Sequence, residues 1–151
     1  MRVVIQKVRE ASVTINNKKV SEIGKGLLVL LGIENEDTTD DIDYLVKKTS
    51  QLRIFDDENG VMNLSVKDVN ADIIVVSQFT LQASTKKGNR PSYIRAAKPD
   101  FSVPMYEKFL ATMEQALGKK VGCGKFGAIM DVALINDGPV TIIIDSKQKE
   151  F

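Results

Sequence analysis

Hydroxyl and amide side chains stand at the end of a strongly apolar stretch of the sequence. The run "DIIVV" is followed directly by Ser77, Gln78, Phe79 and Thr80, and then by a long polar segment. Groups that bind or react are often found where a buried strand runs into a loop. Ser77 or Thr80 is therefore a candidate nucleophile or positioning hydroxyl. The alternative is an ordinary strand end, whose hydroxyls bond to nearby backbone.

The absence of histidine from the sequence limits what these hydroxyls can do. No Ser-His or Cys-His pair can form, and the usual general base near neutral pH and the commonest metal ligand are both missing. Cys123 has no CxxC partner and is interpreted as a packing residue. The many carboxylates form no convincing ligand cluster in the sequence, so we predict neither a metal site nor a cofactor.

A second candidate segment is basic. The stretch "KKGNRPSYIR" places Lys86, Lys87, Arg90 and Arg95 close to Tyr93, with Gly and Pro between them. Cationic side chains next to an aromatic ring suit phosphate contacts combined with base stacking. A solvated basic loop without any partner is the alternative.

The composition is typical of one soluble domain. The chain has 151 residues, of which 43% are hydrophobic, and we assign residues 1–151 to a single domain. The net charge is only +1, but residues 34–59 carry a net −6 and residues 84–125 a net +6. A single cysteine excludes an internal disulfide, and no apolar run approaches 20 residues. We therefore expect a cytoplasmic protein without membrane partners.

The elements that must position these groups follow from the hydrophobic pattern. Strand signals cover "MRVVIQKVREASVTIN", which turns at "NNKK" into "VSEIG", and "GLLVLLGI", which is apolar enough to be buried on both faces. Shorter strands are predicted at "VMNLSV" and "DIIVV", and "QASTKKGNRPSYIRAAKPD" is predicted as a polar loop. Helical spacing predicts one helix in "EDTTDDIDYLVKKTSQLRIF" and a second that ends at Gly118.

The C-terminal segment "ALINDGPVTIIID" contains two β-forming runs that are interrupted at residues 136–139. Gly-Pro makes a poor hairpin turn, because Pro139 donates no hydrogen bond and has a fixed φ, so we expect two separate strands. Seven to nine strands with two long helices do not fit simple βαβ alternation. The prediction is a β-rich α/β domain, in which two helices cover a curved or doubled mixed sheet of barrel-like shape.

Two motifs carry a family resemblance. "SQFTL" at residues 77–81 and "NDGPVT" at residues 136–141 together resemble the paired signature of the D-aminoacyl-tRNA deacylases, also called D-tyrosyl-tRNA(Tyr) deacylases. The segments "KKGNRPS", "GKFGAIMDV", "MRVVIQKV" and "GLLVLLGI" are also similar to that family. The resemblance therefore spans essentially the whole chain.

The resemblance implies a cytoplasmic homodimer that hydrolyses the ester between a D-amino acid and the terminal adenosine of tRNA. In this family a cis Gly-Pro pair, here Gly138 and Pro139, reaches into the partner subunit's pocket and rejects L-amino acids. Glycine has no side chain to reject, so glycyl-tRNA is an expected second substrate. The substrate's own 2′-hydroxyl would assist catalysis, which makes a histidine unnecessary.

The resemblance also suggests individual roles. Thr80 would position the substrate or stabilise the oxyanion, together with Ser77 and Gln78. Phe79 would pack near the terminal adenosine, and Met130 would line the pocket. The predicted contacts to tRNA phosphates are Lys86, Lys87 and Arg90.

Two other functions fit parts of the sequence. One is a module that binds single-stranded RNA ends or free D-amino acids without catalysis. The other is a small ester hydrolase that is indifferent to RNA. The missing histidine disfavours the second alternative, because a general esterase has no substrate 2′-hydroxyl to use.

Overall fold

The computed structural model of the chain describes residues 1–150. Within them lie eight strands, two α-helices and one short 3-10 helix, η1. The strands are β1 (Arg2–Ile15), β2 (Lys18–Ile23), β3 (Gly26–Gly32), β4 (Phe55–Asp56), β5 (Met62–Leu64), β6 (Asp72–Ser77), β7 (Gly122–Cys123) and β8 (Asp131–Asp145). The helices are α1 (Thr39–Gln51), η1 (Phe79–Gln82) and α2 (Pro99–Leu117).

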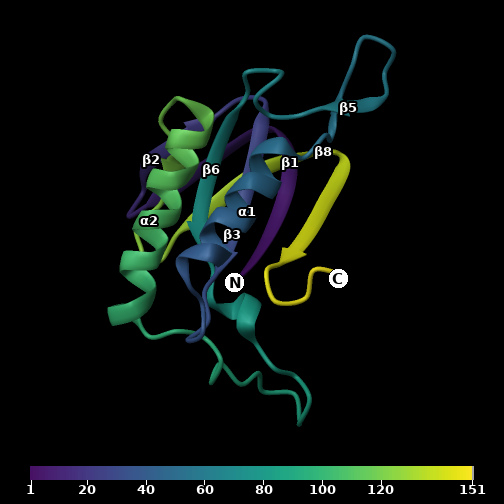
Figure 1. The fold of residues 1–151 in the computed structure, drawn as a ribbon. Coiled ribbons are helices and arrows are strands. Elements are labelled where there is room, and N and C mark those ends of the chain that lie inside the picture. The colour runs from purple at the N-terminus through teal and green to yellow at the C-terminus, as the bar shows by residue number, and fades with distance from the viewer. Residues whose placement is uncertain (151) are drawn as a thin grey trace.

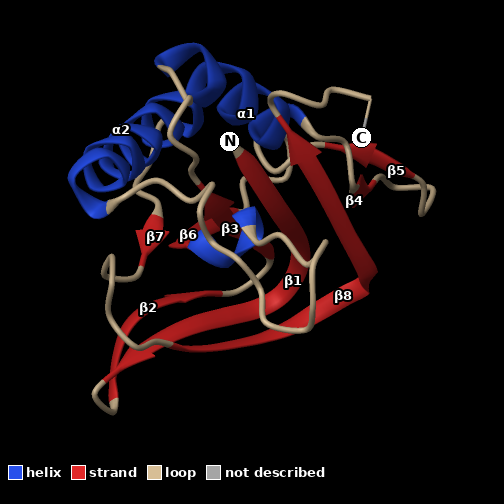
Figure 2. Cartoon of the chain, turned by 90° about the horizontal axis from the view of Figure 1, so that it is seen from below, coloured by secondary structure: helices blue, strands red, loops and turns tan. Residues whose placement is uncertain are grey.

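The long strand β1 is the centre of a mixed sheet. One edge of β1 pairs with β8, and the other edge pairs first with β3 and then with β2, in each case antiparallel. The parallel strands β6 and β7 continue the sheet from β3. Because β1 bends, β2 comes to lie beside β6 and β7, and the sheet nearly closes into a barrel (Figures 1 and 2). The predicted curved, barrel-like sheet is confirmed.

Both faces of β3 are buried, as its apolar sequence predicts. Leu27, Val29 and Leu31 belong to the core under the two helices, which Figure 1 shows side by side on one face of the sheet. Leu28 belongs to a second core inside the barrel, together with Ile74 of β6. Side chains that alternate along a strand point to opposite faces, so β3 needs apolar residues at every position.

The local turn and cap signals in the sequence also hold in the structure. The β1–β2 hairpin turns at Asn16 and Asn17, whose φ angles of 49° and 61° are those of a type I′ turn. The backbone N–H of Thr38 donates to the Asp41 carboxylate at 2.7 Å, which caps α1. The second helix ends immediately before Gly118, as predicted.

The expectation of two strands at the C-terminus is wrong. β8 is one strand, and its pairing with β1 continues on both sides of the interruption. Thr141 pairs with Gln6, and Asn136 pairs with Val8. Residues 137–140 therefore oppose a single β1 residue and form a large bulge. Figure 2 shows the sharp bend of β8.

Asn136 closes this bulge. Its Oδ1 accepts a hydrogen bond from the Val140 backbone N–H, and its Nδ2 donates to Thr141 Oγ1, both at 3.0 Å. The amide thus replaces ladder bonds that the residues of the bulge cannot make with β1. Three short elements, β4, η1 and β7, were not predicted from the sequence. No helix in the described part of the chain is long and apolar enough to cross a membrane.

Candidate active site

A cavity of about 290 Å³ opens where β6 runs into η1. Its walls come from the ends of β3 and β6, the start of α2 and the segment that leads into β8. The lining residues are Leu31, Ile33, Val76, Ser77, Gln78, Phe79, Ala97, Ser102, Phe126, Gly127, Ala128, Met130 and Val132.

The cavity is mainly apolar and has few polar side chains in its lining. None of its lining residues is charged. Three polar side chains line it, those of Ser77, Gln78 and Ser102. The Ser102 hydroxyl already donates to the Lys98 carbonyl at 3.0 Å, within its own helix. A pocket with apolar walls and a few directional groups suits a small organic group that must be held in one orientation.

The predicted residues of the first motif are brought together here. Ser77, Gln78 and Phe79 line the cavity, and Met130 reaches it from a distant part of the sequence. Thr80 follows on η1, and its Oγ1 accepts a hydrogen bond of 2.6 Å from Gln78 Nε2. A hydroxyl whose oxygen is occupied as an acceptor still has its hydrogen to donate. Gln78 therefore orients Thr80 as a donor.

The position of the Met130 side chain depends on Gly124. A Cβ atom at Gly124 would lie 2.3 Å from Met130 Sδ, so only glycine leaves room for the sulfur in its present position. The sequence "GCGKFGAIMD" signals close backbone approach through its glycines, but it does not say what approaches. Three residues of the cavity lining, Ala97, Ser102 and Phe126, were not predicted from the sequence, because apolar and small residues carry no chemical signal.

The predicted phosphate contacts lie outside the cavity. The backbones of Ser84 and Ser92 exchange hydrogen bonds of 2.8 and 2.9 Å and close a loop between them. Lys86, Lys87 and Arg90 lie within this loop and are all exposed. The loop extends away from the body of the protein (Figure 1, blue-green segment below η1).

Gly138 and Pro139 also lie outside the cavity of their own chain. They belong to the bulge of β8, are exposed, and are joined by a cis peptide bond. Within the described residues β8 pairs with β1 alone, so the outer edge of this strand is open. Ile135 and Ile143 are exposed along β8 on either side of the bulge.

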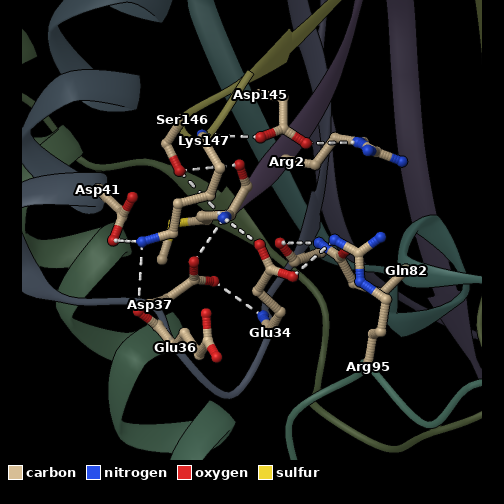
Figure 3. A network of polar contacts seen from close by, with 12 residues as sticks. Arg2, Glu34, Glu36, Asp37, Asp41, Gln82, Arg95, Asp145, Ser146 and Lys147 are labelled. Carbon is tan, nitrogen blue, oxygen red and sulfur yellow. Dashed lines mark hydrogen bonds and ion pairs between the residues drawn. The ribbon is translucent and has the colours of Figure 1, made fainter. Parts of the chain in front are cut away.

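A polar network fixes η1 to three strands (Figure 3). Arg2 Nη1 donates to the Leu81 carbonyl at 3.0 Å, and Arg2 Nε pairs with Asp145 at the end of β8 at 2.9 Å. The buried Gln82 donates to the Gly32 carbonyl at 3.3 Å. The segment that carries Thr80 is therefore anchored to β1, β3 and β8.

Two carboxyl groups of this network, those of Asp37 and Asp41, have pKa values that are shifted in opposite directions. Burial raises the pKa of Asp37, although the Met1 ammonium that it pairs with opposes the shift. Burial would also raise the pKa of Asp41, but hydrogen bonds from Ser146, the Thr38 N–H and Lys147 outweigh it and lower the pKa to about 2.

Among the described residues, no three histidine, cysteine or acidic side chains are arranged to hold a metal ion.

Known proteins are similar to this chain over nearly its whole length. A family model described as D-Tyr-tRNA(Tyr) deacylase matches residues 4–145. A D-aminoacyl-tRNA deacylase from Flavobacterium johnsoniae is 64% identical over 150 residues, which cover 99% of this chain and 100% of that protein. One from Bacteroides thetaiotaomicron is 61% identical with the same coverage.

Two solved structures share the fold. One, described as a c-Myc DNA unwinding element binding protein, is 41% identical, has a TM-score of 0.91 and covers 96% of this chain and 98% of that one. The other, a probable eukaryotic D-amino acid tRNA deacylase, has a TM-score of 0.82 at 19% identity, covers 95% of this chain and 97% of its own, and supports the fold alone. The prediction of an enzyme of the deacylase class is confirmed, and this chain belongs to the D-Tyr-tRNA(Tyr) deacylase family.

Proposed function

We propose that this protein hydrolyses the ester bond of D-aminoacyl-tRNA and releases the free D-amino acid and tRNA. The observation that carries the proposal is the apolar cavity bordered by Ser77, Gln78 and Phe79, with Thr80 oriented as a donor by Gln78. The names of relatives with more than 60% identity support the same substrate class.

The proposed chemistry needs no histidine. An aminoacyl ester is already activated, and the 2′-hydroxyl of the terminal adenosine lies next to it in the substrate. The Thr80 hydroxyl and the backbone N–H groups of Phe79 and Thr80, at the start of η1, then orient the ester and stabilise the developing oxyanion, as preorganised donors do in other acyl transfers. The Gln78 N–H takes no part, because it donates to the Leu31 carbonyl at 2.8 Å. Loss of one such donor typically lowers the rate on the order of a hundredfold or more.

In this proposal the choice of D over L is steric. Once the ammonium and the ester are held, L and D substrates differ in the direction of the side chain. Gly138 and Pro139 of the partner subunit would fill the space that an L side chain needs, and glycine, which has no side chain, would still be hydrolysed. Their exposed position in the β8 bulge, away from their own cavity, supports a role in a second subunit.

The proposal therefore includes a homodimer with the site at its interface. The open edge of β8 and its exposed Ile135 and Ile143 support it, because an uncovered edge strand readily pairs with another chain. The exposed Lys86, Lys87 and Arg90 would contact acceptor phosphates, so affinity for tRNA would fall as salt rises. We place this activity in the cytoplasm, together with the charged tRNA pool.

The test is to incubate the protein with D-tyrosyl-tRNA and L-tyrosyl-tRNA in parallel and to follow ester loss. Rapid loss of the D-ester alone would support the proposal. A D-aminoacyl-tRNA that ends in 2′-deoxyadenosine should be hydrolysed far more slowly. Equal rates with and without the 2′-hydroxyl would instead point to a general esterase.

Nucleic-acid binding without hydrolysis is a second candidate. The exposed basic loop favours it, and so does the similarity to the solved structure of a protein described as binding a DNA unwinding element. The same experiment separates the two functions. If the protein binds tRNA but leaves both esters intact, its function is nucleic-acid binding and not hydrolysis.

A further inference from the structure

Two aromatic rings form an exposed corner at the rim of the cavity. Phe79 lines the cavity yet is 53% exposed, and Tyr93 is 40% exposed. Their ring centroids lie 5.1 Å apart with an interplanar angle of 71°, an edge-to-face contact. Each ring therefore keeps surface available to a partner, and the two rings face different directions.

Tyr93 is held in place. It directly follows Ser92, which closes the basic loop through its two backbone bonds with Ser84. On its other side, Arg95 pairs with the largely buried Glu34 at 2.9 Å, and the Ala97 N–H donates to the Ile33 carbonyl at 3.0 Å. The ring is thus fixed between the cavity and the loop that carries Lys86, Lys87 and Arg90.

An aromatic ring between a pocket and cationic side chains has the chemistry that binds an unpaired nucleotide strand. Bases stack on aromatic faces while basic side chains contact the phosphates. Under the proposed function, the aminoacyl group occupies the cavity and the terminal adenosine lies against Phe79. The next nucleotide along the strand then leaves the cavity in the direction of Tyr93 and the basic loop.

We propose that Tyr93 stacks with the base that precedes the terminal adenosine, an inference that rests on the proposed function. Because the rings of Phe79 and Tyr93 are nearly perpendicular, the two final bases are unstacked from each other when bound, each lying against its own ring. The substrate is thus recognised as a splayed single-stranded end and not only as an aminoacyl adenosine.

The test uses binding and does not depend on hydrolysis. The probe is an RNA stem-loop with an unpaired 3′ end that carries a D-tyrosyl group in amide linkage, so that it is not cleaved. A second probe has an abasic site at the penultimate position. Fluorescence anisotropy gives Kd for the wild type, Tyr93→Leu and Tyr93→Phe on each probe.

Tyr93→Leu should weaken binding of the complete probe about 5- to 100-fold, the usual range for one base–aromatic stack. Tyr93→Phe should bind within about twofold of wild type, because the ring is retained. On the abasic probe, Tyr93→Leu should have no further effect. Tyr44→Leu, which alters an aromatic residue on α1, is the matched control and should leave both affinities unchanged.

An equal loss for Tyr93→Leu on both probes would overturn the inference, because the ring would then act through Phe79 or the loop. Unchanged binding of the complete probe would overturn it as well. Hydrolysis of D-tyrosyl-tRNA is measured separately. If the wild type hydrolyses no ester but the binding pattern is as expected, the proposed function fails and the stacking site stands.

Discussion

At the scale of single residues, the candidate chemistry depends on one short hydrogen bond. Gln78 Nε2 lies 2.6 Å from Thr80 Oγ1 and leaves the hydroxyl hydrogen free to donate toward the substrate. Thr80→Ala should therefore lower the single-turnover rate on D-tyrosyl-tRNA about 100-fold with little change in affinity. Thr80→Ser, which keeps the hydroxyl, should retain most of the rate. An alanine variant with the wild-type rate would remove Thr80 from the mechanism.

Met130 offers a second residue-scale prediction. A methyl group at Gly124 would collide with its sulfur, so Gly124→Ala should force the Met130 side chain to a new position in the cavity wall. We expect KM to rise several-fold, with the free energy of unfolding changed by only about 1 kcal/mol, since a flexible side chain can move aside.

The paired variant shows whether this collision is the cause. In Gly124→Ala/Met130→Ala the sulfur is absent, so the glycine substitution should add nothing to the effect of Met130→Ala alone. Steady-state kinetics and urea unfolding of all four proteins complete the cycle. Additive effects on KM would contradict the proposed contact.

At the scale of elements, the position of η1 is set by close packing against the end of β3. A Cβ atom at Gly32 would lie 2.8 Å from the Leu81 Cβ and 3.2 Å from the Gln78 carbonyl oxygen. Gly32→Ala should push η1 outward and lower kcat roughly 10- to 100-fold, because small displacements of catalytic groups are costly. It should also destabilise the fold by about 1–3 kcal/mol.

Gly24→Ala is the matched control for this prediction. Its new methyl group would meet its nearest atom, the Arg9 carbonyl oxygen, at 4.0 Å, which is ordinary contact. It should leave kcat unchanged in the same assay. A Gly32→Ala enzyme as active as Gly24→Ala would show that η1 tolerates displacement.

Elements with local signals could be predicted from the sequence, and elements set by distant partners could not. The Asn16–Asn17 turn and the end of α2 at Gly118 are determined by the residues at those positions, which favour a positive φ angle. From the sequence, residues 137–140 suggested a boundary between two strands. They form a bulge within one strand, because β1, which is far away in the sequence, pairs with β8 on both sides of them. η1 packs closely against Gly32 of β3, a contact that the residues of "SQFTL" alone do not indicate.

The candidate site divides in the same way. Ser77, Gln78 and Phe79 could be named from one motif, but the pattern alone did not distinguish them from an ordinary strand end. Met130 came from the family resemblance, since no spacing rule links it to residue 77. Ala97 and Phe126 have no chemical signature, and only the placement of α2 and of the turn before β8 brings them to the cavity.

At the scale of the whole molecule, the polar network around both ends of the chain predicts acid sensitivity. Hydrogen bonds lower the pKa of Asp41 to about 2, below its value in the unfolded chain. The stabilisation is therefore fully present above about pH 4 and is lost as the pH falls toward 2, with a magnitude of about 2 kcal/mol. The difference in Tm between wild type and Asp41→Asn should narrow from pH 5 to pH 2. A constant difference would mean that Asp41 does not titrate with folding.

Cooperation between two subunits is the last whole-molecule prediction. Gly138 has a φ of 137°, and a Cβ there would lie 2.7 Å from Val140 Cγ2, so Gly138→Ala should distort the bulge. If the bulge excludes L side chains, this variant should hydrolyse L-tyrosyl-tRNA about tenfold faster than wild type or more, a discrimination that one methylene group can supply.

Mixing two variants then tells whether the bulge acts on its own cavity or on that of a partner. A Gly138→Ala subunit keeps Thr80, while a Thr80→Ala subunit keeps an intact bulge. Subunits are exchanged with Thr80→Ala in large excess, so that nearly every Gly138→Ala subunit has a partner with an intact bulge. If the bulge acts across the interface, L-ester hydrolysis per Gly138→Ala subunit should fall to the wild-type level, while D-ester hydrolysis continues. An excess of the Thr80→Ala/Gly138→Ala double variant should give no such fall. Persistent L-ester hydrolysis in both mixtures would place the bulge at its own cavity and would remove the reason for a dimeric site.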